Sequence, residues 1–339
     1  MSKKNSNVIL KNGFENFEDL SKVYLNFKHN FQKLKHNSYV VAISGGPDSL
    51  ALAALTKALS YEKKIKFYYV LVDHKIRHNS KKEANQVKLL LKKNKFSCNI
   101  LSNNHKITKN IQGKARDIRY EMLKNFCRKK KVKTILTAHN LEDQVETFFI
   151  RLSRGSGITG LSGMKTLSKL DKNTWLFRPL LDVKKKTLIE ISKKVFGKYF
   201  KDPSNKNAKY LRTKIRNLEA PLQKSGVNYD QIIKSIKNLA SSKETLDEYY
   251  EKIFKEIVKI SNNEVLINWK KFKVLNLEIK IKVINSAIKI LKNNYYNPRA
   301  SKVTNLIKHL ESNKLNRLTL AKCLFLRKKD QLSLKLEKI

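Results

Sequence analysis

The chain has 339 residues, 41% of them hydrophobic, which is enough to bury one large core and one smaller core. No stretch approaches the roughly 18 consecutive apolar residues of a membrane span, and the N-terminus lacks the apolar segment of a signal peptide. We therefore expect a cytoplasmic protein with no membrane partner. The cysteines Cys98, Cys127 and Cys323 lie far apart without a CxxC pair, which argues against a disulfide framework and a zinc ribbon.

The net charge is +45, from 73 lysines and arginines against 28 acidic residues. Such a field attracts polyanions, and nucleic acid is the obvious partner. The excess is mostly lysine and is accompanied by abundant asparagine and isoleucine, which an AT-rich coding sequence would also produce. The charge by itself leaves both explanations open.

Strand and helix patterns alternate through the first two thirds of the chain. Residues 1–37 form a polar N-terminal extension in which residues 14–29 are predicted to be helical. Short apolar runs then predict strands over 39–43, 67–72, 98–101 and 134–138. Helical periodicity predicts helices over 50–59, 81–93, 112–130 and 141–152. This alternation predicts a doubly wound parallel α/β sheet that binds its ligand along the carboxyl edge of the strands.

The pattern changes after about residue 220. Long lysine-rich helical stretches run from Tyr229 to about residue 293, and the tail over 318–336 alternates more like short strands. We therefore predict an α/β domain over 38–222, followed by a smaller, mainly α-helical domain over 223–339.

A glycine-containing loop joins the first predicted strand to the first apolar helix. It consists of Ser44, Gly45, Gly46, Pro47, Asp48 and Ser49. The two glycines let the backbone approach a phosphate closely, and the next helix directs its free N–H groups and positive dipole toward it. The loop lacks the lysine of a Walker A motif and the spacing of GxGxxG. For the hexapeptide alone, an ordinary turn with a capping serine is the alternative.

The loop resembles the PP-loop of the ATP pyrophosphatase superfamily, whose members cleave ATP to AMP and pyrophosphate. Further segments are similar, in order and spacing, to those of the tRNA(Ile)-lysidine synthases. They are VDHKIR (72–77), GKARDIRY (113–120), TAHNLEDQVET (137–147), RGSG with GLSGM (154–164), RPLL (178–181), and DPSN (202–205) with Arg212 and Arg216. The resemblance covers roughly residues 40–220, and TLAKCL (319–324) is weakly similar to a later TLGGC segment.

Three positions depart from the family pattern. Asn140 stands where the family usually has a second histidine, and Glu142 where it usually has aspartate. Asn207 replaces the last aspartate of a DxSNxD element. Asn140 and Glu142 keep hydrogen-bonding capacity or charge, whereas Asn207 lacks the carboxylate that a metal or tRNA role there would use.

The resemblance implies a two-step ligation. ATP activates carbon 2 of the wobble cytidine in tRNA(Ile), and the ε-amine of free L-lysine then attacks that carbon, with release of AMP and pyrophosphate. The implied cofactors are ATP and Mg²⁺, and the implied partners are tRNA(Ile) and lysine. The domain over 38–222 would be catalytic, and that over 223–339 would bind tRNA or substrate. The metal ligands and a homodimeric state stay open.

The expected nucleotide-binding residues are those of the 44–49 loop, in which Asp48 would position either a magnesium ion or the attacking amine. Capping of the following helix is an equal alternative for Asp48. His139 follows a buried strand and has Asp143 four residues on, which favours a shared catalytic site over a structural histidine. Arg116 is the fourth candidate catalytic residue, while Gln144 and Glu146 are expected to face solvent.

The candidate tRNA or lysine contacts are six polar residues. Arg119 lies about one helical turn from Arg116, and Arg212 and Arg216 form a second such pair. Each pair would therefore present two guanidinium groups to phosphate. A solvated basic helix is the alternative for both pairs, and a simple turn is the alternative for the loop that begins at Arg154. The full set is Arg119, Arg154, Asp202, Asn205, Arg212 and Arg216.

Two other functions also fit the phosphate loop or the charge. A tRNA 2-thiolation enzyme of the PP-loop class is one, although the members that use an iron–sulfur cluster need CxxC ligands that this chain lacks. A non-catalytic RNA-binding protein would explain the net charge, but it would not explain the loop together with His139 and Asp143.

Overall fold

The computed structural model describes residues 3–32, 34–77, 79–103, 111–201, 211–261, 263–292, 298–312 and 316–337. The chain divides into two compact units, Met1–Ala240 and Ser241–Ile339. The division falls inside helix α11 (Tyr229–Ile257) rather than at the predicted 222/223 boundary.

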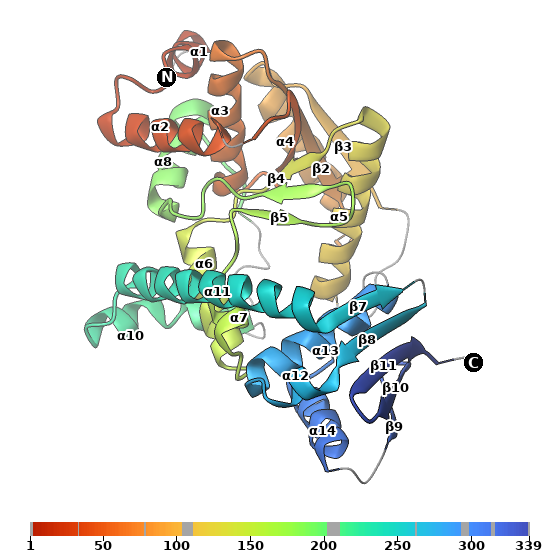
Figure 1. The fold of residues 1–339 in the computed structure, drawn as a ribbon. Coiled ribbons are helices and arrows are strands. Elements are labelled where there is room, and N and C mark those ends of the chain that lie inside the picture. Colours follow the sequence, from red (N-terminus) through yellow and green to blue (C-terminus); the bar gives the residue numbers. More distant parts are fainter. Residues whose placement is uncertain are drawn as a thin grey trace. The chain divides into compact units, whose positions relative to one another are not determined.

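The first unit contains a six-stranded sheet with the order β3-β2-β1-β4-β6-β5. Figure 1 labels β2, β3, β4 and β5 of this sheet. Every neighbouring pair is parallel except β5 and β6, which are antiparallel. The strands are β1 (Ser38–Ile43), β2 (Lys66–Asp73), β3 (Cys98–Ser102), β4 (Thr134–Leu136), β5 (Leu167–Lys169) and β6 (Trp175–Phe177). The predicted parallel α/β sheet is confirmed.

Helices cover both faces of this sheet, so the central strands are buried on both sides. Tyr39 and Val41 face the core built by α1, α2, α3, α4 and α8, while Val40 faces the core built by α5. The helices of this unit are α1 (Lys3–Lys11), α2 (Glu18–Gln32), α3 (Pro47–Glu62), α4 (Ser80–Lys93), α5 (Ile111–Lys130), α6 (Leu141–Leu152), α7 (Ile158–Leu161), α8 (Lys185–Phe196), α9 (Leu211–Arg216), α10 (Glu219–Lys224) and the first part of α11.

The N-terminal segment, expected as an extension over 1–37, is part of the first core. Leu10, Phe14, Leu20 and Phe27 are each about 1% exposed and belong to the cluster that α3 and α8 build. Its apolar residues recur at helical spacing, so burial of that face accounts for the packing.

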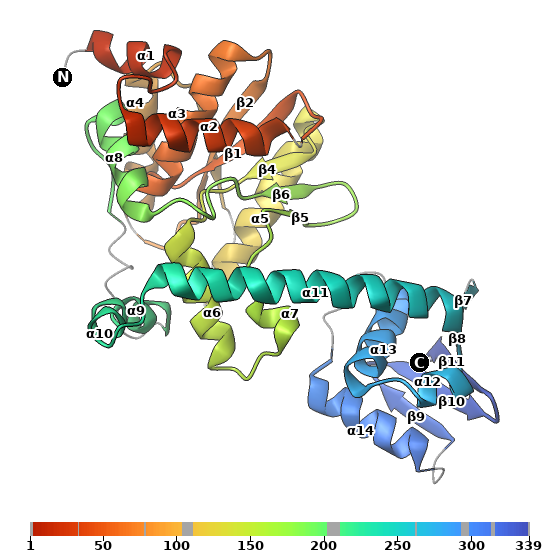
Figure 2. The ribbon, with the colours of Figure 1, turned by 60° about the vertical axis from the view of Figure 1, so that its left-hand side comes forward.

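Strand β1 lies at the point where the strand order reverses. The chain runs from β1 outward through β2 to β3 on one side and then returns to β4 on the other side of β1. Figure 2 labels β1, β2 and β4. Val40 pairs with Ile135 and also with Tyr68, so the loops after β1, β2 and β4 leave the same edge of the sheet. Such a reversal opens a crevice at the carboxyl ends of the strands, which is where ligands bind in open α/β sheets.

The second unit combines the expected helices with a five-stranded sheet of order β7-β8-β11-β10-β9, antiparallel throughout. Its core includes Trp269, Phe272, Val283 and Phe325. Besides the rest of α11, its elements are β7 (Val258–Ser261), β8 (Glu264–Asn268), α12 (Trp269–Lys273), α13 (Leu277–Lys292), α14 (Ala300–Glu311), β9 (Arg317–Leu320), β10 (Cys323–Lys328) and β11 (Gln331–Leu336). In the described part of the chain, no helix has the length and apolar character needed to cross a membrane.

Candidate active site

The loop after β1 is closed by a serine network. The Ser49 hydroxyl, on a residue 5% exposed, donates to the Gly46 carbonyl at 3.0 Å and accepts from the Ser44 amide at 3.1 Å. The Ser44 and Ser49 hydroxyls lie 3.1 Å apart. Pro47 then opens α3 at a position where its missing N–H costs nothing. Ser49 therefore holds the loop in shape from inside.

The two glycines of the loop have different roles. Gly45 has a φ of +83°, and a Cβ there would lie 2.4 Å from Val87 Cγ2. Gly46 has a φ of −72° and caps α3, and within the described residues only Ser44 Oγ, at 3.6 Å, would come within 4 Å of a Cβ there. Gly45 is thus required by backbone conformation and packing, while Gly46 leaves space open above the helix N-terminus.

Asp48 sits in the first turn of α3 as a partly buried carboxyl group. Burial raises its pKa to about 6, the Lys185 ammonium opposes this rise, and the negative charge of Asp143 adds to it. Its Oδ1 atom is buried without a hydrogen-bond partner among the described residues. Asp143 therefore lies close enough for its charge to act on Asp48.

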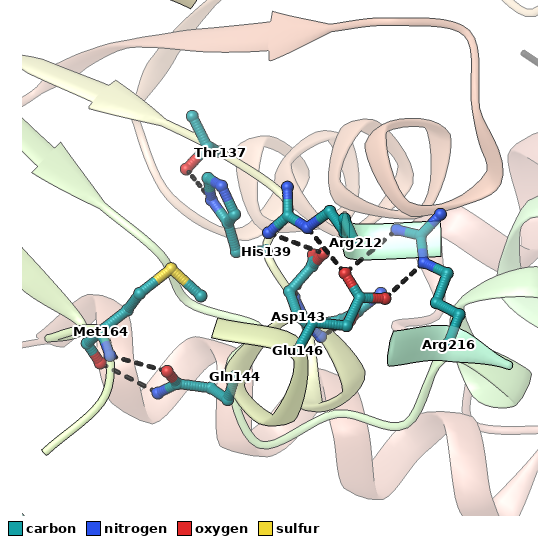
Figure 3. Close-up of polar contacts among 9 residues, drawn as sticks. Thr137, His139, Asp143, Gln144, Glu146, Met164, Arg212 and Arg216 are labelled. Carbon is teal, nitrogen blue, oxygen red and sulfur yellow. Dashed lines mark hydrogen bonds and ion pairs between the residues drawn. The ribbon is translucent and has the colours of Figure 1, made fainter. Parts of the chain in front are cut away.

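His139 follows β4 at the same edge of the sheet. Its Nδ1 atom lies 2.9 Å from the Thr137 hydroxyl, which orients the ring (Figure 3). Burial is the main cause that lowers the pKa of His139 to about 4. The negative charge of Asp143 opposes this fall, and the positive charges of Arg178 and Arg116 add to it. The imidazole is therefore neutral at neutral pH.

Asn140 begins helix α6 and forms a capping box with Asp143. Its Oδ1 accepts from the Asp143 amide at 2.9 Å, and Asp143 Oδ2 accepts from the Asn140 amide at 3.2 Å. Asparagine is a favoured N-cap residue, which accounts for its place where the family usually has histidine. Glu142, the second departure, accepts from the Lys185 amide at 2.9 Å and 3.0 Å and so binds the start of α8.

Glu146 lies one turn beyond Asp143 and is buried, so the expectation that it faces solvent is wrong. Arg212 Nε is 2.7 Å from Glu146 Oε2, and a second guanidinium nitrogen of Arg212 is 3.8 Å from Asp143 Oδ1. Arg216 pairs with the same Glu146 carboxylate through Nε and, at 3.2 Å, through a terminal nitrogen (Figure 3). Burial opposes the charge of Arg216, but Glu146 and the nearby Asp143 and Asp48 raise its pKa above the ordinary value.

Gln144 is also buried, contrary to expectation. Its amide donates to the Met164 carbonyl at 2.9 Å and accepts from the Met164 amide at 2.7 Å (Figure 3). The sequence signal for Glu146 was its spacing from Asp143, which puts both carboxylates on one face of the helix. For Gln144 the sequence offered no such partner, because Met164 is 20 residues away.

The two arginines of α5 do not act as one pair. Arg116 lies over the Tyr120 ring, 5.0 Å from its centroid, and its charge reaches His139. Arg119 Nε instead donates to His74 Nε2 at 3.3 Å, at the end of β2. Arg154 is exposed in the loop after α6. The candidates Asp202 and Asn205, and the departure Asn207, lie outside the described residues.

The residues at this edge fit a magnesium ion that arrives with a nucleotide. Among the described residues, no three His, Cys, Asp or Glu side chains gather as a metal cluster. In nucleotide sites Mg²⁺ is usually held by one or two carboxylates together with phosphate oxygens. The free Oδ1 of Asp48 and the neighbouring Asp143 supply two such carboxylates.

Comparisons with known proteins show the family to which the chain belongs. Residues 20–222 match the PP-loop domain family. The chain is 36% identical over 201 residues to the tRNA(Ile)-lysidine synthase of Orientia tsutsugamushi, covering 58% of this chain and 45% of that protein. It is 33% identical to the Wolbachia pipientis wMel protein of the same name, over 78% of this chain and 62% of the other. The protein of that name from Rickettsia typhi is 30% identical, over 91% of this chain and 73% of that protein.

Among solved structures, a U34-tRNA thiolase from Methanococcus maripaludis has a similar fold. The TM-score is 0.54 at 18% identity, over 66% of this chain and 80% of that chain. At this level of identity the likeness concerns the fold alone.

The reversal in strand order, the loop after β1 and the match over residues 20–222 define a PP-loop protein. Within that class, the chain belongs to the tRNA(Ile)-lysidine synthase family, because it is 30% identical to a member of which it spans 73%. The chain spans 45% of the length of the Orientia tsutsugamushi protein and 62% of that of the Wolbachia pipientis protein, which is less than two thirds of each.

Proposed function

We propose that the protein is a carbon–nitrogen ligase that joins L-lysine to carbon 2 of the wobble cytidine of tRNA(Ile), at the expense of ATP. The observation that carries the proposal is the meeting of the phosphate loop after β1 with His139 and Asp143 after β4, at the reversal in strand order. A nucleotide held by the loop would place its α-phosphate beside these side chains.

In the first step, the oxygen on carbon 2 of the cytidine attacks the α-phosphorus of ATP and pyrophosphate leaves. The open space beside Gly46 and the N-terminus of α3 support binding of the leaving pyrophosphate. Mg²⁺ held by Asp48 and Asp143 would neutralise phosphate charge. The neutral ring of His139 offers a hydrogen bond to the base or phosphate without adding charge.

In the second step, the lysine ε-amine attacks carbon 2 and AMP leaves. The attacking amine must lose a proton. Asp48, where it does not hold Mg²⁺, is suited to accept one near neutral pH, because burial raises its pKa to about 6. The charge of Arg116 lowers the pKa of His139, which supports a role for its guanidinium in stabilising the charge of the adenylated intermediate. We place this reaction in the cytoplasm, where tRNA, ATP and lysine are available.

The test is to incubate the purified protein with ATP, labelled lysine and a tRNA(Ile) transcript carrying the CAU anticodon. We expect label in the RNA, with AMP and pyrophosphate as products. A transcript with uridine in place of the wobble cytidine is the matched control and should stay unlabelled. Accumulation of ADP, or no label in the cytidine transcript, would overturn the proposal, and transfer of sulfur instead of lysine would indicate a thiolation enzyme.

A further inference from the structure

Four hydrogen bonds fasten the loop after α6 back onto that helix. Gln144 bonds both ways to the backbone of Met164, at 2.9 Å and 2.7 Å. One terminal nitrogen of Arg151 donates to the carbonyls of Gly160, at 2.6 Å, and Gly163, at 3.0 Å. Gly163 has a φ of +71°, and a Cβ there would lie 2.9 Å from Gln144 Oε1, so the loop fits closely against the helix. These bonds fix the Gly160–Met164 end of the loop against helix α6.

The loop returns to the catalytic edge of the sheet. The Lys165 carbonyl accepts from Arg178 at 2.8 Å, and the Arg178 charge is one of those that lower the pKa of His139. Gln144, which binds the loop, directly follows Asp143, which lies in the candidate active site, so both belong to one turn of α6 (Figure 3). The Lys165 end of the loop therefore contacts a residue whose charge acts on His139.

The tip of the loop has the properties of a phosphate contact. Arg154 is exposed and carries a permanent charge. At Gly155 and Gly157, no heavy atom of the described residues lies within 4 Å of the position that a Cβ would take, so a phosphate can approach the backbone. Arginine side chains and backbone N–H groups are the usual donors to RNA and DNA backbones.

We propose that residues 154–157 contact the phosphate backbone of the RNA substrate outside the reacting nucleotide, and that Gln144 and Arg151 are positioning residues that fix this loop, whose tip follows the C-terminal end of α6. This rests on the proposed function, which supplies RNA as the substrate. Gln144 and Arg151 act through the loop, and the pairing of Gln144 with Met164 couples RNA docking to the helix that carries Asp143.

The experiment measures binding of the tRNA transcript and of ATP separately, for wild type, Arg154→Ala, Gln144→Met and the double variant. Methionine keeps the length and helix propensity of glutamine but removes both hydrogen bonds. We expect each single change to weaken tRNA binding about tenfold, as for loss of a hydrogen bond to a charged group. The affinity for ATP should stay within twofold, and the double variant should bind no more weakly than the weaker single variant.

Arg128→Ala is the matched control, since Arg128 lies in the last turn of α5, which leads to the start of β4 and thus to the opposite edge of the sheet. It removes the same charge and should leave tRNA binding within twofold. Thermal unfolding shows whether each variant is folded. The proposal would be overturned if the loss of tRNA affinity in the double variant equalled the product of the two single losses. An equal loss of tRNA affinity in Arg128→Ala would also overturn it. Binding that follows the prediction without lysine transfer would instead refute the proposed ligase activity alone.

Discussion

Arg212 Nε lies 2.7 Å from the carboxylate of Glu146, a side chain that is only 3% exposed. The pair joins α6 to α9, two helices that are distant in sequence, and Arg216 binds the same carboxylate. The Glu146 carboxylate accepts hydrogen bonds from Arg216 and forms an ion pair with Arg212, whose Nε has no hydrogen-bond partner among the described residues. Both arginines are thereby held beside Asp143, at the nucleotide edge of the sheet.

Glu146→Gln should therefore destabilise the protein and impair nucleotide use. The neutral amide leaves two cations without their counter-charge, at a cost of about 1–3 kcal/mol in the free energy of unfolding. Chemical denaturation measures this, and Glu256→Gln is the matched control, because the Glu256–Lys271 pair is 59% and 53% exposed. An exposed pair contributes at most about 1 kcal/mol. Equal losses in the two variants would contradict the role of Glu146.

Arg216→Ala should weaken both ATP and tRNA binding. The charges of Asp143 and Asp48 both act on Arg216, so it is close to the nucleotide site and is no purely tRNA-directed contact. We expect a fall of about tenfold in ATP affinity, in line with loss of one charge-assisted contact. Calorimetric titration with ATP checks this. An unchanged ATP affinity in the folded variant would assign Arg216 to tRNA alone.

Gly46→Ala should reduce ATP affinity at little cost in stability. The residue has an ordinary φ of −72°, and the open space beside it is where a phosphate would lie. A methyl group there would obstruct that approach and weaken ATP binding by about tenfold or more. Gly157→Ala is the control, because Gly157 also precedes a helix, with a φ of −77° and open surroundings.

Gly45→Ala should behave differently from Gly46→Ala. The positive φ of Gly45 and the contact at 2.4 Å with Val87 would destabilise the fold itself, by roughly 1–2 kcal/mol or more. The melting temperature therefore separates the two glycines. If both variants lost ATP affinity without any change in stability, the assignment of Gly45 to packing would be wrong.

Much of the site could be predicted from the sequence because its signals are local. The segments SGGPDS and TAHN each directly follow a buried strand, and their residues by themselves predict where that strand ends and the next helix begins. The burial of Glu146 and Gln144 could not be predicted in this way, since segments beginning 20 and 66 residues later cover them. The burial of Leu10 and Phe27 could not be predicted either, because it depends on packing against α3 and α8, which come later in the chain.

Asp48→Asn should stabilise the folded protein at neutral pH while reducing activity. Burial raises the pKa of Asp48 from 3.8 to about 6, so the folded state binds more protons than the unfolded state between those values. The stability that this group contributes therefore falls as the pH rises from about 4 to 6, and the ionised form costs on the order of 3 kcal/mol at pH 7. Asparagine removes that cost, so the gain in melting temperature should appear at pH 7 and vanish near pH 4.

Binding of tRNA should depend strongly on salt. The net charge of +45 and the exposed arginine at position 154 imply release of counterions from the RNA. If about six phosphates are neutralised, affinity should fall on the order of 10³-fold between roughly 50 and 200 mM salt. A salt series with wild type and Arg154→Ala measures this, and removal of one phosphate contact should flatten the slope by about 0.7–0.9. The slope of Arg128→Ala should equal that of wild type. A flat series for wild type would attribute the lysine content to codon composition, because charges that do not meet the RNA release no counterions from it.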